Sequence, residues 1–585
     1  MSRVADLERL LEQDALAANI AALWDKWYKE RQKKEKLWKE VRDFVMATDT
    51  SATSATTTGW RNKTTIPKLC QIRDNLHSNY LAALFPNDNW LRWEGYTADS
   101  DTKSKKNAIQ AYMSNKVRQS DFIETADKLV YDFIDYGNCF ADVDFVNEVH
   151  IDPATGDEIQ GYVGPKLVRI SPLDIVFDPT AESFTETPKI RRYRKKFGDW
   201  LVEMESMPED AGWIKEAVAK CVDKRSRASS FTVEDYSKAQ GYLVDGFGNM
   251  QEYLQSDTIE VLEIEGNLYD PVEKVLLKNS IITVVDRSTI VRKQSLPSWH
   301  GKSTIVHAGW RKRPDNLWAM GPLENLVGMQ YRLDHLENLR ADAADMVAFP
   351  MIKIKGDVDE FEINPGTEIH CIDGDVDFLH PDTTFLAVES QMQLLEQRME
   401  EFAGAPREAL GIRSPGEKTA FEVSTLTNAA SRVFQEKTTS LEINLFEKAL
   451  NNMLESAKRN MDSTDIVRVM DDDLGVSEFI EISREDLTAT GKLRPVGARH
   501  FAAQQRLLQD LSNLLSSSVG AKINPHVSGK RLSNLVNDVL QLDRYDLVSD
   551  NVAVFEEQET QRLVQSGQED LAVEASITSD EFNAQ

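Results

Sequence analysis

Apolar residues recur at helical spacing at the start of the chain and again after residue 320. Over residues 5–46, leucine, isoleucine, tryptophan and tyrosine return at helical intervals, which predicts one long helix. A stripe of leucines that begins after Gly321 and ends at Met346 predicts a second long helix. Further helices are expected at about 67–84, 103–119, 122–136 and 385–402, and a strand at 90–93.

Between Gly137 and about Pro314 the pattern changes to short apolar runs separated by Gly, Pro, Asp and Asn, which predicts strands. These strands are expected at 139–146, 161–170, 175–178, 259–265, 275–277 and 281–285. A helical insertion at about 197–222 interrupts them, and a second β segment is expected at about 348–379. The predicted fold class is therefore α+β, with a mixed first half and a mainly helical second half.

Residues 419–461 contain neither Gly nor Pro. A helix of this length would extend for roughly 60 Å, because each residue adds about 1.5 Å. Few globular cores are that wide, so this helix is expected to act as a strut between neighbours. Two further helices are expected near 499–517 and 530–541, and the acidic segment after Asn551 is expected to be loose.

The charge balance bears on nucleic-acid binding. The chain of 585 residues has 68 basic and 96 acidic residues, which gives a formal charge of −28. A protein that holds DNA tightly normally has the opposite sign, because lysine and arginine displace counterions from the phosphates. The charge therefore disfavours tightly held DNA but is compatible with DNA that slides past the protein.

The N-terminus and the cysteines indicate the cellular compartment in which the protein is made. The first residues, MSRVADLE, carry acids where a signal peptide needs an apolar stretch, and no apolar run is long enough to span a membrane. Synthesis in a cytoplasm is therefore expected. The four cysteines are far apart, which disfavours a disulfide framework and a zinc ribbon, so buried free thiols are expected. They are Cys70, Cys139, Cys221 and Cys371.

Motifs for catalysis or cofactor binding are incomplete. Gly301-Lys302-Ser303-Thr304 resembles the end of a phosphate loop, but the first glycine of that motif would fall on Leu296, so a turn is expected. Gly246-x-Gly248 lacks the third glycine of a dinucleotide site. Asp373–Asp377 resembles the start of a calcium loop, but its sixth position is Phe378 and not Gly, and its twelfth is Thr384 and not Glu. Asp471–Asp473 has no partner acidic cluster. No catalytic, cofactor-binding or metal site is predicted.

The order of elements and three short stretches carry a resemblance to a known family. The stretches are Gly321–Gln330 continuing through Leu336–Leu339, Gly404-Ala405-Pro406 to Gly411, and Lys418–Val423, with a weaker fourth at Ser171–Pro179. Together they resemble the portal, or head–tail connector, proteins of tailed bacteriophages, most of all those of short-tailed phages. The likeness covers the element order from about residue 60 to 545.

The resemblance implies a set of domains. They are a wing at 1–320, a first stem helix at 321–347, a clip at 348–385, a second stem helix at 386–403, a tunnel loop at 404–418, a long wing helix with a following mixed segment at 419–494, a helical crown at 495–550 and an acidic tail at 551–585. The subunit would join a ring, usually a dodecamer, at one vertex of the capsid. Double-stranded DNA would pass through this ring during packaging and ejection.

The implied role is structural and not enzymatic, with no cofactor. The expected partners are further copies of the chain, the large terminase subunit, the major capsid and scaffolding proteins, a tail adaptor and DNA in transit, with no membrane. The expected location is the portal vertex of the virion, reached by assembly in the host cytoplasm. An acidic tunnel would repel phosphate and let DNA slide.

Basic residues in the loop and the clip are the candidates for contact with DNA. They are Arg407, Arg413 and Lys418 in the tunnel loop, and Lys353 and Lys355 in the clip. Salt bridges between subunits, for the loop with Glu408 or Glu417, are an equal alternative. For the whole chain, the competing interpretations are another virion protein such as a tail adaptor, a terminase-like ATPase or nuclease, and a monomeric binding module.

Overall fold

The structure is a computed structural model that describes most of the first 461 residues and short pieces beyond. The described residues are 15–46, 64–86, 90–96, 100–151, 158–206, 212–226, 258–270, 274–299, 301–348, 351–355, 375–379, 387–403, 433–461, 465–471, 476–485, 487, 491–495 and 497. Helices and strands are mixed along them, which confirms the α+β class. Two compact units are present, a larger one of Met1–Leu84, Leu91–Asp465 and Ile482–Pro495, and a smaller one of Phe85–Trp90, Ile466–Glu481 and Val496–Gln585.

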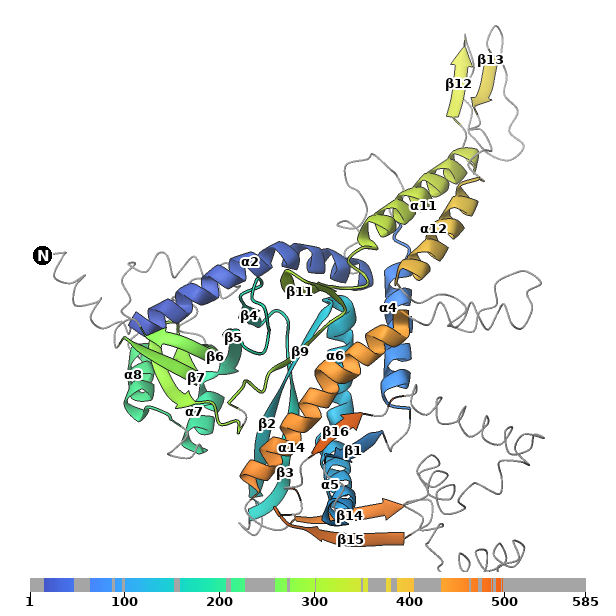
Figure 1. The fold of residues 1–585 in the computed structure, drawn as a ribbon. Helices are drawn as coiled ribbons and strands as arrows, with labels where there is room; N and C mark the ends of the chain where they lie inside the picture. The colour runs from blue at the N-terminus through green and yellow to red at the C-terminus, as the bar shows by residue number, and fades with distance from the viewer. Residues whose placement is uncertain are drawn as a thin grey trace, which may run out of the picture. The chain divides into compact units, whose positions relative to one another are not determined.

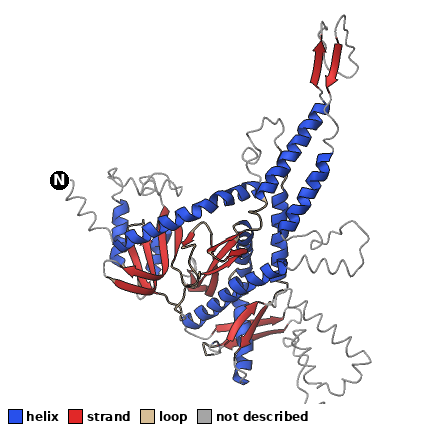
Figure 2. Ribbon diagram, turned by 45° about the horizontal axis from the view of Figure 1, so that its top comes forward, coloured by secondary structure: helices blue, strands red, loops and turns tan. Residues whose placement is uncertain are grey.

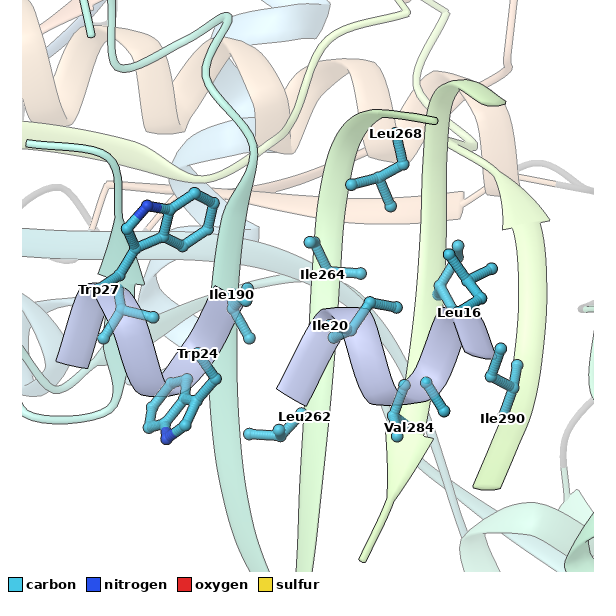
Figure 3. Close-up of a cluster of buried hydrophobic side chains, with 13 residues drawn as sticks. Leu16, Ile20, Trp24, Trp27, Ile190, Leu262, Ile264, Leu268, Val284 and Ile290 are labelled. Atoms are coloured by element: carbon cyan, nitrogen blue, oxygen red, sulfur yellow. The ribbon is translucent and has the colours of Figure 1, made fainter. Parts of the chain in front are cut away.

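A five-stranded antiparallel sheet forms one layer of the larger unit. Its strands, in order, are β4 (Ile175–Phe177), β5 (Lys189–Lys196), β6 (Thr258–Asp270), β7 (Val275–Val285) and β8 (Thr289–Ser295). The long helix α2 (Ala15–Met46) packs on one face of this sheet, and α7 (Phe197–Ser206) and α8 (Lys215–Ser226) pack on the other. The side chains of α2 that face the sheet include Leu16, Ile20, Trp24 and Trp27 (Figure 3).

The second layer is a three-stranded sheet with helices against it. Its order is β3 (Glu158–Ile170), β2 (Asn138–Ile151) and β9 (Val306–Gly309). The helices α6 (Phe122–Asp135) and α14 (Lys448–Asn460) contact β2 and β3, and α14 buries Leu450, Met453 and Leu454. Around them lie α4 (Lys68–Leu84), α5 (Ser100–Gln119), the hairpin of β10 (Arg311–Arg313) and β11 (Asn316–Met320), and the pair of β1 (Leu91–Gly95) and β16 (Gly491–Pro495).

Two helices and two strands form an arm, the name used here for α11 (Val327–Ala348), β12 (Met351–Lys355), β13 (Asp375–Leu379) and α12 (Ala387–Ala403). The helices lie side by side, and the antiparallel strands follow their far ends (Figures 1 and 2). This is the helix–β–helix order predicted from the sequence. The first helix begins at Val327 and not at Gly321, because residues 322–326 form turns in which the Gly321 amide donates to the Glu324 carboxylate.

Several predicted strands differ from the observed ones. The predicted strands at 275–277 and 281–285 are one strand, β7, whose register shifts near Gly266 of its partner. Strand β5, a run of six cations among eight residues, is not among the predicted strands. No pattern in the sequence indicates the π-helical turn η4 (Glu442–Glu447) within the predicted helix at 419–461, of which residues 433–460 are described as helical.

Several predictions fall on residues outside the described ranges. They are residues 5–14 of the first predicted helix, Cys371, the tunnel loop with Arg407, Arg413 and Lys418, the first part of the long helix, the crown apart from residues 495 and 497, the acidic tail, and Gly246–Gly248. The smaller unit contributes the strand pair β14 (Asp465–Asp471) and β15 (Val476–Ile482), and Asp471 ends β14. Among the described helices, none is long and apolar enough to span a membrane. Cys139 and Cys221 are buried free thiols as predicted, whereas Cys70 is half-buried.

Candidate functional site

The tip of the arm, β12 with β13, has one charged and one apolar face. Residues directly opposite each other in an antiparallel pair share a face, and alternate residues point to opposite faces. Lys353 lies opposite Asp377, and Lys355 opposite Asp375, in the register of the two strands. Ile352 and Ile354 alternate with these lysines. The structure therefore places both predicted clip lysines on one exposed face, each facing an acidic position of the same chain.

Large apolar side chains are exposed along the whole arm of the single chain. They are Tyr331, Met346 and Val347 on α11, Ile354 on β12, and Leu394 and Phe402 on α12, with Phe402 the most exposed at 61%. A patch of such side chains marks protein–protein contacts, whereas single ones are common on protein surfaces. Full burial of one such side chain from complete exposure contributes about 1.5–3 kcal/mol, and these are 37–61% exposed, so roughly half of that is still to be gained. The arm therefore offers several apolar side chains that a contact could bury.

A buried ion pair fixes the base of α12 against α4. The Lys68 ammonium lies 2.7 Å from a Glu400 carboxylate oxygen and 3.7 Å from Glu396, and the Lys68 side chain is 6% exposed. Lysine at the first residue of a helix is unfavourable, because the helix dipole leaves partial positive charge there. A carboxylate partner offsets this cost. The position of Lys68 was the one sequence signal that could have revealed this contact.

Residues 64–66 are held by polar side chains on one face of α11. The Thr64 amide donates to Asn338 Oδ1 at 2.7 Å, and the Ile66 amide donates to Asp334 Oδ1 at 3.0 Å. Gln330 Nε2 donates back to the Ile66 carbonyl at 2.6 Å. Burial raises the pKa of Asp334 to about 6, because these hydrogen bonds only partly replace its lost hydration. We call Thr64–Lys68 with Gln330, Asp334, Asn338 and Glu400 the arm root.

A second junction joins the start of the arm to α2 and β11. The buried Glu324 carboxylate accepts hydrogen bonds from the Gly321 amide and from Trp38 Nε1, and lies 3.9 Å from the Lys34 ammonium. Gly137 adopts φ +66°, and a Cβ atom there would lie 2.2 Å from the Gly321 amide nitrogen. The backbone approach at this junction therefore requires glycine at position 137.

The hydroxyl groups of the Gly301–Thr304 segment donate hydrogen bonds to buried carboxylates, and the segment does not form a phosphate loop. Ser303 Oγ donates to Glu265 at 2.5 Å, and Thr304 Oγ1 donates to Asp142 at 2.6 Å. Strand β9 follows this turn, whereas a phosphate loop opens a helix. Burial raises the pKa of Glu265 to about 8, with a further contribution from Asp142. The expected turn is present, and its hydroxyls satisfy acids between the two sheets.

The remaining predicted sites add no chemistry in the described part of the chain. Within the described residues, no three His, Cys, Asp or Glu side chains are grouped so as to hold a metal ion. Of the calcium-like segment, residues 375–377 belong to β13 and the others lie outside the described ranges. The arm, its root and its tip are therefore the features from which a function is inferred.

Comparison with known proteins assigns no family. The chain matches no protein-family model, and no curated protein matches its sequence. The geometry of the arm and the chemistry of its surface therefore carry the functional argument.

Proposed function

We propose that the chain is a structural, non-enzymatic subunit of the portal ring of a tailed bacteriophage, most similar to those of short-tailed phages. The observation that carries the proposal is the arm: two paired helices joined by a β tip and held to a mixed α+β body by a buried root. In a ring of twelve, this arm would be the stem and clip, and double-stranded DNA would pass along it during packaging and ejection.

The exposed apolar side chains of the arm support assembly into a ring. In a closed ring every arm has a neighbour on each side, so apolar residues on both helices become buried. Leu394 and Phe402 are 48% and 61% exposed in the single chain. Burying their exposed part would stabilise each contact by about 1–2 kcal/mol per side chain. A monomer would instead leave this surface in water.

The charge of the chain supports DNA as a passenger. With a formal charge of −28 per subunit, the ring would repel the phosphates of DNA. It would make few lysine or arginine contacts with them, so DNA would be bound weakly. Lys353 lies opposite Asp377, and Lys355 opposite Asp375, in the strand register of the tip, and acids at these positions would weaken the attraction of the lysines for phosphate. The tip would be the docking site first of the large terminase subunit and then of a tail adaptor, and the body would meet the capsid and scaffolding proteins at the virion vertex.

Substitution of the arm surface tests this proposal. Leu394→Ser with Phe402→Ser should shift the purified chain from rings to smaller species, because apolar contact between neighbouring arms is lost. Val202→Ser with Tyr269→Ser is the matched control, since these two side chains are 67% and 60% exposed on the body. Sedimentation velocity measures both. Equal loss of rings in the two double variants would contradict the assignment of the contact to the arm.

A further inference from the structure

A groove on the larger unit concentrates positive charge in an acidic protein. It has a volume of about 380 Å³ and lies between the middle of α2, strand β5 and the turn before β4. Its cationic lining residues are Arg31, Lys36, Lys39, Arg42, Arg192 and Arg194. Trp38, Tyr136 and Leu173 supply apolar lining. Low-dielectric walls of this kind strengthen the field of the charges around them.

The acidic residues near the groove are already engaged. Glu35 accepts from Arg31 Nε and Nη2 at 3.1 and 2.7 Å, and Arg31 Nη1 donates to the carbonyls of Pro172 and Ile175. Asp174 accepts from Arg192 at 3.1 Å. Glu35 thus offsets Arg31, and Asp174 offsets Arg192, so the positive charge of the groove rests on Lys36, Lys39 and Arg42. Arg31 and Arg192 are buried and shape the wall, whereas the exposed charge comes from Lys36, Lys39 and Arg42.

Three of the cations form a row on one side of α2. Lys36, Lys39 and Arg42 are exposed and three residues apart, so the row extends for roughly 9 Å along the helix axis. Among the described residues, no carboxylate lies within ion-pairing distance of these three. The nearby acids Glu40 and Asp43 also lie close to Tyr331 of α11, whose pKa is raised first by burial and then by the charge of these two carboxylates.

We propose that this groove binds the phosphodiester backbone of a nucleic acid. One strand of a duplex advances about 3.4 Å along the duplex axis per phosphate, so a row of roughly 9 Å laid along that axis spans two to three phosphate steps. Arginine and lysine form charge-assisted hydrogen bonds with phosphate oxygens, so a row of three can contact neighbouring phosphates of one strand. The groove belongs to α2 and β5 and not to the arm, so this inference goes beyond the proposed portal function and does not depend on it.

Binding of a short fluorescein-labelled DNA duplex to the full chain, followed by anisotropy over a range of salt, tests the proposal. The test variant is Lys36→Gln, Lys39→Gln, Arg42→Gln. The control is Lys26→Gln, Lys29→Gln, Lys33→Gln, which removes the same charge from exposed positions of α2 outside the groove. We expect the test variant to bind about tenfold more weakly or worse at low salt, and its salt slope to fall by about three. The control should stay within about twofold of the unsubstituted chain.

Three results would overturn the proposal. The first is the absence of DNA binding by the unsubstituted chain. The second is an equal loss of affinity in the two triple variants, which would show diffuse electrostatic attraction. The third is displacement of the duplex by polyglutamate at equal charge concentration, which would assign the groove to an acidic peptide. Ring assembly of the same samples, measured in parallel, keeps this result separate from that on the portal proposal.

Discussion

At the scale of single residues, the arm root depends on charges that have left water. Lys68 and Glu400 are both buried and lie 2.7 Å apart. Removing one partner of a buried pair leaves the other charge without compensation, which typically costs about 3–5 kcal/mol. Replacing both partners with apolar residues of similar volume is often close to neutral. The attraction within the pair therefore stabilises the fold less than the loss of one partner destabilises it, because the remaining charge would be buried and unpaired.

We therefore expect Lys68→Met to loosen the arm root and Lys68→Met with Glu400→Met to recover most of the loss. Hydrogen exchange of the α11 and α12 amides measures this locally. Arg340→Met, which breaks an exposed i,i+3 pair with Glu337, is the control and should change stability by less than about 1 kcal/mol. A double variant as unstable as Lys68→Met would contradict the argument.

Asp334 makes the arm root sensitive to pH. Burial raises its pKa from an ordinary value of 3.8 to about 6 in the folded chain, so folding favours its neutral form. The contribution of Asp334 to the free energy of unfolding is therefore fully present below about pH 4, and it is lost as the pH rises through 6. Exchange of the α11 amides should therefore speed up between pH 4 and 6, after correction for the intrinsic pH dependence of exchange.

Asp334→Asn should remove that dependence, because an amide is neutral throughout and can still accept from the Ile66 amide. Asp345→Asn, at an exposed position of the same helix, is the control and should keep it. If the pH dependence survives in Asp334→Asn, another group is responsible.

At the scale of elements, the glycine turn before β2 decides how the arm meets the body. Gly137→Ala should lower the thermal midpoint of the larger unit, because its Cβ would overlap the Gly321 backbone and φ is positive there. Gly328→Ala, where a Cβ meets nothing within 4 Å, should be neutral or stabilising by up to about 1 kcal/mol, since alanine favours a helix. Equal destabilisation by the two substitutions would refute this role for Gly137.

The elements that sequence could predict are those whose signal is local. The leucine stripe of α11 and the apolar face of α2 place the helices correctly. Strand β5 escaped because its buried Lys189, Arg191 and Arg192 read as a solvated charge run. Their carboxylate neighbours lie elsewhere in the chain, as Asp142 does for Arg191. A pattern along one segment cannot reveal partners supplied by another.

The arm root could not be predicted from the sequence for the same reason. Ile66 and Asp334 are 268 positions apart, and Lys68 and Glu400 are 332 apart. Only the spacing of Gln330, Asp334 and Asn338, four residues apart on one helix face, marks a polar stripe in the sequence, and such stripes usually face solvent. The basic groove likewise combines α2 with β5, two segments that the sequence analysis treated separately.

At the scale of the whole molecule, a single chain leaves apolar surface of its arm uncovered. Its arm exposes apolar side chains on both helices and on the tip, and a two-stranded hairpin is marginally stable alone. The proposed ring would supply this cover by symmetry, because each copy would present the same surfaces to its neighbours. The charge of −28 per copy would then act on DNA as a repulsive lining.

The mass of the purified chain by light scattering, with negative-stain images of the same sample, tests this claim most directly. The account predicts particles of twelve 66.2 kDa chains, about 790 kDa, with a central hole. If purified protein needs a template, the same rings should form with capsid and scaffolding components present. A chain that stays at 66.2 kDa alone and with those components would contradict the portal proposal.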